Sequence, residues 1–277
     1  MVEAIPDLNE RELTTIVDLV YSNSGIVLHD GKRALIRARL QKRLRTGGFP
    51  TFSEYLAHLR RDQSGEELAG LLDAIATNHT SFFREAAHFD FLRERVVPEL
   101  VASRAAVVRG WSAACSTGEE PYTLAMTLLE ALPDGLRDRL FIQASDISTK
   151  ALATARAGVF GVPRIATVPR PFLSKYFDRG LGEQDGLARV RPAIRRPIEF
   201  RHLNLLGIDD LGQRFNFIFC RNVMIYFDTS VRQRVVAMLE RHLAPGGYLF
   251  VSYSETLNGL HHQLQWIAPA VYQRRMA

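Results

Sequence analysis

Residues 107–122 read VVRGWSAACSTGEEPY, an apolar run followed by small residues and then by a helix-start signal in Thr117 and Glu120. Small residues permit a tight turn, so this stretch predicts a strand that turns directly into a helix. A dinucleotide-binding turn would carry G-x-G-x-x-G here. This turn has one glycine, and it places Glu119 and Glu120 where a pyrophosphate would be repelled. The two carboxylates favour a cationic ligand, although a plain capped helix start is the alternative interpretation.

Strand-like and helical patterns alternate along the C-terminal part of the chain. We expect further strands at 140–142, 215–220 and 248–251, and helices at 119–131, 149–157 and 229–243. This alternation predicts βαβ units and a doubly wound, mostly parallel sheet. The pattern breaks between about residues 161 and 200, which are rich in Pro, Gly and Arg and contain one alternating run. We interpret this stretch as an inserted β-rich subdomain.

The first ninety residues predict a small helical bundle. Apolar side chains recur there at helical spacing, namely Leu13, Ile16, Val17, Val20, Leu35, Ile36, Leu40 and Leu44. Thr51 with Glu54, and Ser64 with Glu67, match the capping box and indicate two helix starts. The sequence therefore divides into a helical domain at 1–90 and an α/β domain at 91–277, with the insertion inside the latter.

Composition excludes several classes of protein. The chain has 277 residues, 47% of them hydrophobic, and contains no apolar run of the eighteen or more residues that a membrane span needs. Its N-terminus carries no secretory signal pattern, and its two cysteines are too few for a disulfide framework, so we expect a cytoplasmic protein. They form no zinc-type spacing with the eight histidines, and we expect no metal. The net charge of +5 is far below the level that indicates nucleic-acid binding, but it suits an acidic partner.

Basic residues cluster on one predicted helix. They are Lys32, Arg33, Arg37, Arg39, Lys42, Arg43 and Arg45. Such a helix could steer the protein towards an acidic surface. A solvated helix face is the alternative, because charge runs usually mean no more than that.

An acid follows the second predicted strand of the α/β domain. Doubly wound sheets bind ligands at the carboxyl ends of their strands, near the switch in strand order. Asp146, in the sequence ASDIS, stands at such an end. There it can accept hydrogen bonds from both ribose hydroxyls of a nucleoside, although it could instead cap the next helix.

Several longer motifs resemble one known family, the chemotaxis receptor methyltransferases or CheR family. They are TNHTSFFRE at 77–85, WSA at 111–113, STGEEPY at 116–122, SDI at 145–147, FCRNVMIYF at 219–227 and LAPGGYLF at 243–250. Their order and spacing agree with the family, and the resemblance covers nearly the whole chain. It implies a helical N-terminal domain beside a Rossmann-like methyltransferase domain that binds S-adenosylmethionine and carries a small antiparallel β insertion. The implied product is S-adenosylhomocysteine.

The resemblance also implies roles for particular residues. The positions that match cofactor contacts are Asn78, Thr80, Arg84, Glu120, Asp146, Asn204, Leu205, Arg221 and Asn222. Arg84 and Tyr226 match the positions closest to the transferred methyl group, and we expect them to be catalytic. Glu119 could share the role of Glu120 or face solvent. Cys115 and His79 depart from the usual family residues, and we expect no cofactor contact through either side chain.

The implied reaction needs few catalytic groups. The acceptor is a glutamate carboxylate of a chemoreceptor, which is ionised at neutral pH because its reference pKa is near 4.3. No general base is then required, and alignment of oxygen, methyl group and sulfur can supply about 7–11 kcal/mol of the barrier reduction. Arg84 or Tyr226 would position the carboxylate or close the site. Alternatively, Arg84 only pairs with a neighbouring acid and Tyr226 packs in the sheet core.

The implied partner is the acidic helical region of the receptor, and we expect the enzyme to act as a monomer. Whether the insertion also grips a peptide tether at the receptor's C-terminus is open, because Arg179-Gly180 and Gly186-Leu187 keep the family pattern only loosely.

Two rival functions predict different features in the sequence. A nucleic-acid methyltransferase would show a proline-rich element after strand 215–220 or a nucleophile at Cys220, for which a buried strand cysteine is the simpler explanation. A non-catalytic adaptor would have lost cofactor positions that stand intact here.

Overall fold

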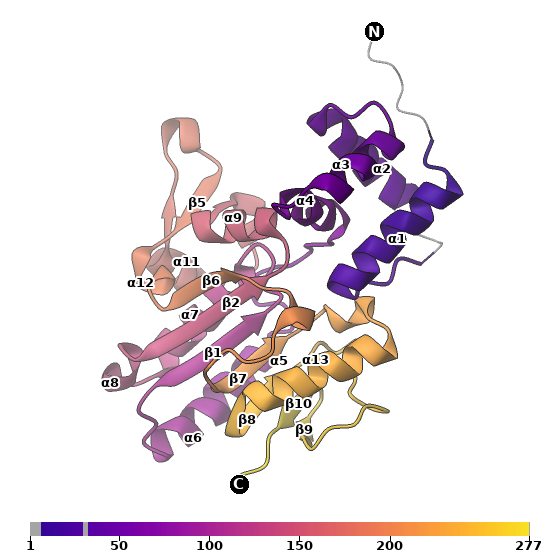
Figure 1. Cartoon of the computed structure of the whole chain (residues 1–277). Helices are drawn as coiled ribbons and strands as arrows, with labels where there is room; N and C mark the ends of the chain where they lie inside the picture. The colour runs from indigo at the N-terminus through magenta and orange to yellow at the C-terminus, as the bar shows by residue number, and fades with distance from the viewer. Residues whose placement is uncertain (1–6, 30–32, 277) are drawn as a thin grey trace.

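The computed structural model describes residues 7–29 and 33–276. The N-terminal part is a bundle of four helices (Figure 1), α1 (Glu10–Ser24), α2 (Arg33–Gly47), α3 (Phe52–Arg61) and α4 (Glu66–Ile75). Their apolar faces enclose one core that includes Ile16, Val20, Leu40, Leu44 and Tyr55, all fully buried. The helical bundle predicted from the apolar spacing is therefore confirmed.

The two predicted capping boxes have different outcomes. Thr51 caps α3 and accepts a hydrogen bond from the backbone N–H of Glu54, as predicted. Helix α4 begins close to its predicted start, but its N-cap is Gly65 instead of Ser64. The carboxylate of Asp62 accepts hydrogen bonds from the hydroxyl of Ser64 and from the backbone N–H of Glu67, because an ionised group is a stronger acceptor than a hydroxyl.

A seven-stranded sheet forms the centre of the C-terminal part. Its strands are β1 (Val108–Ala113), β2 (Leu140–Asp146), β6 (Ile198–His202), β7 (Phe215–Cys220), β8 (Leu243–Phe250), β9 (Gln265–Ala268) and β10 (Val271–Gln273). They follow the order β6-β2-β1-β7-β8-β10-β9, in which the first five are parallel and β10 pairs antiparallel with both β8 and β9. The chain leaves β1 for β2 on one side and later returns to β7 on the other. The strand order thus switches at β1, where a ligand crevice is expected.

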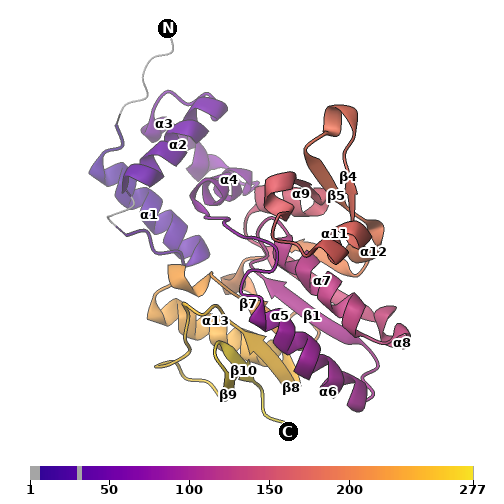
Figure 2. The same ribbon diagram turned by 180° about the vertical axis from the view of Figure 1, so that it is seen from behind.

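Helices cover both faces of this sheet. On one face lie α5 (Ala87–Phe91), the π-helical turn η2 (Leu92–Val96), α6 (Val97–Ala102) and α7 (Glu119–Ala131), which Figure 2 shows in front of the strands. They pack on Phe217, Phe219 and Phe250. Helix α13 (Thr229–His242) packs on Ile218 and Leu249 from the other face. Leu136 of the short helix α8 (Asp134–Arg137) packs against the same core as α7, and Leu152 of α9 (Thr149–Ala157) packs on Ala144 of β2.

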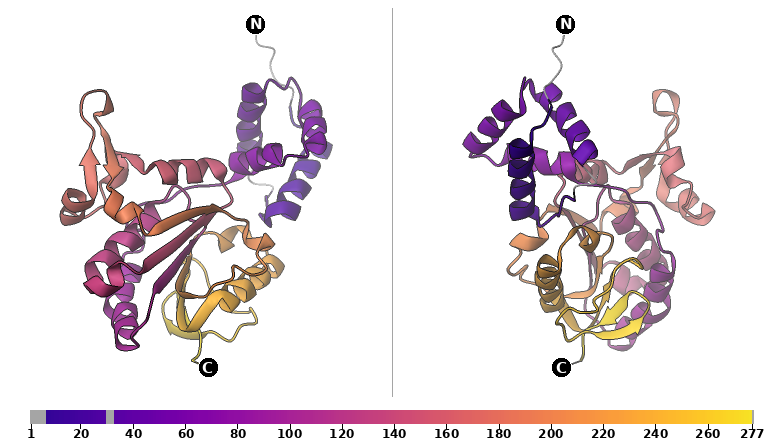
Figure 3. Two further views of the ribbon diagram at one scale, coloured as in Figure 1. Left: turned by 60° about the vertical axis from the view of Figure 1, so that its left-hand side comes forward. Right: turned by 90° about the vertical axis from the view of Figure 1, so that its right-hand side faces the viewer.

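The insertion contains a three-stranded antiparallel sheet of β3 (Val159–Gly161), β5 (Leu187–Val190) and β4 (Phe177–Arg179), in that order. Short helices α10 (Val162–Ile165), α11 (Arg170–Tyr176) and α12 (Pro192–Arg195) and the turn η3 (Gly182–Gln184) complete it. Residues 198–200, which the expected range included, instead belong to β6 and pair with β2 in the large sheet. The insertion and the helical bundle project from the same end of that sheet (Figure 3).

Candidate active site

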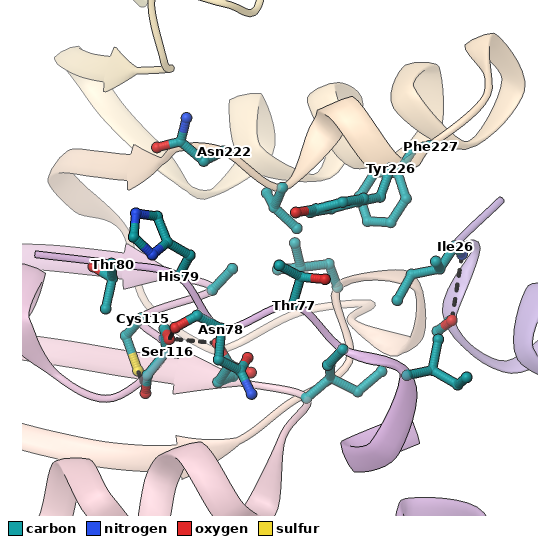
Figure 4. A pocket seen from close by; sticks show the side chains of 18 of the residues that line it. Ile26, Thr77, Asn78, His79, Thr80, Cys115, Ser116, Asn222, Tyr226 and Phe227 are labelled. Atoms are coloured by element: carbon teal, nitrogen blue, oxygen red, sulfur yellow. Dashed lines mark hydrogen bonds between the residues drawn. The ribbon is translucent and has the colours of Figure 1, made fainter. Parts of the chain in front are cut away.

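A deep pocket lies at the carboxyl ends of β1, β2 and β7, against the helical bundle. It contains about 1230 Å³ of space, including the part open to solvent. Its wall includes every residue that the sequence analysis assigned to the site: Asn78, Thr80, Arg84, Glu120, Asp146, Asn204, Leu205, Arg221, Asn222 and Tyr226. Figure 4 shows part of this wall. The switch point of the sheet therefore brings together side chains from both domains.

Asp146 is buried at the end of β2, with its carboxylate held by two backbone groups. Oδ2 accepts from the N–H of Ser116 at 2.7 Å and Oδ1 accepts from the N–H of Ser148 at 2.8 Å. Burial raises the pKa of Asp146, and the backbone hydrogen bonds oppose that rise. Each oxygen keeps further acceptor capacity, which suits two adjacent hydroxyl groups. Helix α9 is capped by Ser148 instead, so Asp146 is not needed as its N-cap.

Glu120 lies in the first turn of α7 and forms part of a buried charge cluster. Its Oε1 accepts from the hydroxyl of Ser112 at 2.7 Å, and its Oε2 lies 3.0 Å from Nη1 of Arg221. Nη2 of Arg221 forms a second ion pair, 3.1 Å long, with Glu85. Burial raises the pKa of Glu120, and Arg221 opposes the rise. With both carboxylates ionised, the three side chains carry a net charge of −1.

The segment between the two domains forms another wall of the pocket. The backbone carbonyl of Asn78 accepts from the hydroxyl of Ser116 at 3.0 Å, which ties this segment to the turn after β1. Nη1 of Arg84 donates to the carbonyl of His79 at 3.0 Å. Among the described residues, no acid forms an ion pair with the Arg84 guanidinium. The alternative that Arg84 only pairs with a neighbouring acid is therefore not supported. Its position leaves a cation at the pocket wall.

Tyr226 ends the 3₁₀ turn η5 (Met224–Tyr226) that follows β7. It is half-buried, lines the pocket, and therefore does not pack in the sheet core. Figure 4 shows its ring lying along the wall with the hydroxyl directed into the space opposite Thr77. The backbone carbonyl of Tyr226 accepts from the N–H of Val27 at 2.8 Å, beside an isolated bridge between Ile26 and Phe227. The helical bundle thus fixes the turn that carries Tyr226.

Asn204 and Leu205 contribute differently from the acids. The side chain of Asn204 donates to the carbonyl of Asn23 and accepts from the N–H of Leu206. It therefore holds the start of the turn η4 (Leu205–Gly207) against α1. This arrangement leaves mainly the backbone of Asn204 and the side chain of Leu205 to face a ligand.

Glu119 takes neither of the two roles that the sequence analysis considered. Its side chain is fully buried and absent from the pocket wall. It accepts from the hydroxyl of Thr117 at 2.7 Å and from the guanidinium of Arg164, in helix α10. Glu119 therefore ties the insertion to the turn after β1.

Other wall residues were not assigned to the site by the sequence analysis. Residues 26–28 come from the connection after α1, and Arg39 from α2, where its Nη1 donates to the carbonyl of Ile75 at 2.6 Å. His79 also lines the pocket. Only Ser116 could have been found, because small polar residues in a strand–helix turn offer backbone and hydroxyl donors to a ligand.

The donor set fits S-adenosylmethionine. Asp146 offers acceptors for a ribose diol, and the cluster around Glu120 carries the negative charge that an ammonium group would neutralise. Nε of Arg221 is buried and has no hydrogen-bond partner in the described chain, which suits a ligand that also carries a carboxylate. Among the described residues, no group of three His, Cys, Asp or Glu side chains is arranged to hold a metal ion. No helix within 7–29 or 33–276 is long and apolar enough to cross a membrane.

Comparisons with known proteins agree with this geometry. Residues 11–76 match the all-alpha domain of the CheR methyltransferases, and residues 78–272 match their SAM-binding domain. A chemotaxis protein methyltransferase of Borreliella burgdorferi is 37% identical, with 97% of this chain and 95% of the relative covered. Those of Salmonella typhimurium and Escherichia coli are 39% and 38% identical, each covering 96% of this chain and 90% and 91% of the relative. The chain belongs to the CheR methyltransferase family.

Proposed function

We propose that this protein transfers the methyl group of S-adenosylmethionine to glutamate side-chain carboxylates of chemoreceptors, forming methyl esters and S-adenosylhomocysteine. The observation that carries the proposal is the convergence of ten residues, from the segment after the helical bundle and from the strand ends, on one pocket at the switch point. The relatives are named chemotaxis protein methyltransferases, and this chain matches them over almost their full length, which supports the proposal. The sulfonium of the cofactor supplies an already activated methyl group.

The proposed acceptor explains why the pocket needs no general base. A glutamate carboxylate is ionised at neutral pH, so the protein has to orient it and exclude water. Arg84 presents a guanidinium at the wall, which can hold a carboxylate by charge-assisted hydrogen bonds. Tyr226 places its hydroxyl in the same space (Figure 4). We assign both residues to positioning the acceptor oxygen in line with the methyl group and sulfur.

Cofactor roles in the proposal follow the charges of the site. Asp146 would bind the ribose hydroxyls, and Glu120, with Arg221 behind it, would bind the ammonium group of the amino-acid part. Asn78, Thr80, Leu205 and Asn222 would complete the wall. Because both carboxylates are buried, a bound cation would stabilise their ionised forms.

The basic surface on α2 supports an acidic helical partner, although fewer of its side chains are available than the sequence predicted. Arg37 pairs with Asp7, and Arg43 pairs with Glu67 at 2.6 Å, so these cations are used within the bundle, as is Arg39. Lys42 and Arg45 are exposed and pair with no acid in the described residues, while Lys32 and the side chain of Arg33 lie outside them. We assign receptor docking to these two side chains.

Base C5 chemistry on nucleic acid is disfavoured by the state of Cys220. Its thiol is fully buried inside β7, and burial raises its pKa well above the ordinary value. A thiol in that state is a poor nucleophile because the thiolate is the reactive form.

The test is transfer of labelled methyl from S-adenosylmethionine to receptor-containing membranes, followed by mild alkali. Label released as methanol is the expected result, because carboxyl methyl esters are base-labile. Label that resists alkali would point to nitrogen or carbon methylation and would contradict the proposal. Tight cofactor binding without transfer to receptors with intact glutamate sites would favour a binding adaptor.

A further inference from the structure

The segment after β8, Ser252–Glu255, lies behind the pocket and contributes nothing to its wall. Both of its end residues are buried, with exposed fractions of 1% for Ser252 and 8% for Glu255. A buried carboxylate is costly unless it is well satisfied, so its partners show what it is for. Neither residue carried a motif in the sequence.

Glu255 holds the turn after β7 entirely through backbone groups. Oε2 accepts from the N–H groups of Asn222 at 3.0 Å and Ser252 at 2.8 Å. Oε1 accepts from Met224 at 2.8 Å and Ile225 at 3.3 Å. A single carboxylate therefore holds three of the four residues, 222–225, that lead to Tyr226.

Ser252 connects this turn to Glu85. Its hydroxyl accepts from Nδ2 of Asn222 at 2.7 Å and lies 2.8 Å from Oε1 of Glu85. An ionised carboxylate only accepts, so the one hydroxyl proton must go to Glu85. Glu85 in turn pairs with Arg221, the partner of Glu120. One hydroxyl thus links the Asn222 turn to the charge cluster at the amino-acid end of the pocket.

Backbone geometry indicates why such links are needed. Asn222 and Glu85 both adopt left-handed conformations, with φ of +58° and +57°. Non-glycine residues remain in this region only where surrounding contacts hold them. The Ser252 hydroxyl contacts the side chains of both residues.

We infer that Ser252 and Glu255 are positioning residues for methyl transfer: Glu255 sets the Asn222–Tyr226 turn and Ser252 couples it to Glu85. This inference rests on the proposed function, because it acts through Asn222 and Tyr226. The two residues touch neither the cofactor space nor the acceptor space directly.

The test measures the affinity for S-adenosylhomocysteine by titration calorimetry, which requires no receptor and no turnover. Ser252→Ala is expected to weaken binding about tenfold, the effect of one lost positioning hydrogen bond. Asn222→Ala should weaken it at least as much, and the double variant should be no weaker than Asn222→Ala alone, because Ser252 acts through Asn222. Ser103→Ala, which removes a hydroxyl at the end of α6, is the matched control.

Three results separate the inference from the proposed function. If Asn222→Ala weakens binding while Ser252→Ala stays within twofold of the wild type, the inference alone is overturned. If the two effects multiply, Ser252 acts independently and the coupling is overturned. If Asn222→Ala binds normally, the assignment of Asn222 in the proposed function fails, and the inference fails with it.

Glu255→Gln gives a second route that keeps the side-chain shape. Its amide N–H₂ would face backbone N–H groups, so the turn should shift, and turnover on receptor membranes should fall about tenfold or more. Glu99→Gln, in α6, is the control for loss of a carboxylate that also accepts a hydrogen bond, here from the hydroxyl of Tyr248. Normal turnover of a folded Glu255→Gln variant, with melting temperature as the check on folding, would contradict its positioning role.

Discussion

Two charged regions stood out in the sequence, and the structure uses them in different ways. The acids Glu120 and Asp146 are far apart in sequence, but both follow strands of one parallel sheet and line the same pocket. The basic residues of α2 are close in sequence, but they divide between internal partners and solvent. Strand ends are brought together by the topology of the sheet, whereas a helix spreads its side chains around its whole circumference.

The two charged regions also differ in their exposure to solvent. Glu120 and Asp146 are desolvated, and burial raises the pKa of each. Lys42 and Arg45 remain in water, where each charge is worth little. Changes at the strand ends should therefore have larger effects than changes on α2.

The largest effect is expected for Asp146→Ala, measured as binding of S-adenosylhomocysteine. Loss of an acceptor for two hydroxyls, at about 1.5–3 kcal/mol for each charge-assisted hydrogen bond, should weaken binding more than about 100-fold. Asp138→Ala, an exposed acid near the other end of β2, should bind normally. Equal affinity of Asp146→Ala and the wild type would remove Asp146 from the site.

Arg84→Ala and Tyr226→Phe test the acceptor side of the pocket. Each should lower the turnover number by about 10- to 100-fold, because misplacing the reacting oxygen costs alignment, with a smaller effect on cofactor affinity. Turnover is measured with receptor membranes, and Arg201→Ala on β6 serves as the exposed-arginine control. If both variants stayed within a few-fold of the wild type, neither residue would be catalytic.

Acid should weaken cofactor binding at a higher pH than ordinary carboxylates would predict. The ammonium group binds the ionised form of Glu120 and the ribose hydroxyls donate to the ionised form of Asp146; both pKa values are raised, so affinity is full at neutral pH and is lost as the pH falls through those values. The decline should begin above pH 4.5 and approach about tenfold per pH unit for each proton taken up. Calorimetry of Asp146→Asn should give a shallower decline. An unchanged affinity down to pH 4 would contradict the charge assignment.

The smallest effect belongs to α2. Lys42→Glu with Arg45→Glu should raise the Michaelis constant for receptor membranes a few-fold at low salt and leave the turnover number unchanged, because these charges act on encounter. Arg43→Ala should instead lower the free energy of unfolding by about 1–2 kcal/mol, since it leaves Glu67 and the hydroxyl of Tyr55 without their partner. If the double reversal left the Michaelis constant unchanged at low salt, Lys42 and Arg45 would only form a solvated helix face.

Much of the fold followed from local patterns. The helices at 119–131 and 149–157 begin and end where they were predicted, because strand ends, caps and breakers mark them locally. The last predicted strand was too short: β8 starts at Leu243, which pairs with Phe215 of β7 before a register shift, and regular pairing resumes at Tyr248. The antiparallel strands β9 and β10 were not predicted, because distant pairing stabilises them and they carry no strong pattern of their own.

The same limit applies to the site. Residues identified from motifs at strand ends all reached the pocket, because sheet topology fixes where strands end. The wall at 26–28 and the support at 252–255 depend on contacts with segments about 200 and 30 to 170 residues away, such as Ile26 with Phe227 and Ser252 with Glu85. Nothing local in the sequence encodes those contacts.

The central claim is that the acidic strand ends hold S-adenosylmethionine with its methyl group facing Arg84 and Tyr226. A crystal structure with S-adenosylhomocysteine tests it most directly. We predict both ribose hydroxyls within hydrogen-bond distance of Asp146, the amino group at Glu120, and the sulfur facing the space between Arg84 and Tyr226. A ligand bound elsewhere, or bound with its sulfur turned away from those two side chains, would contradict the account.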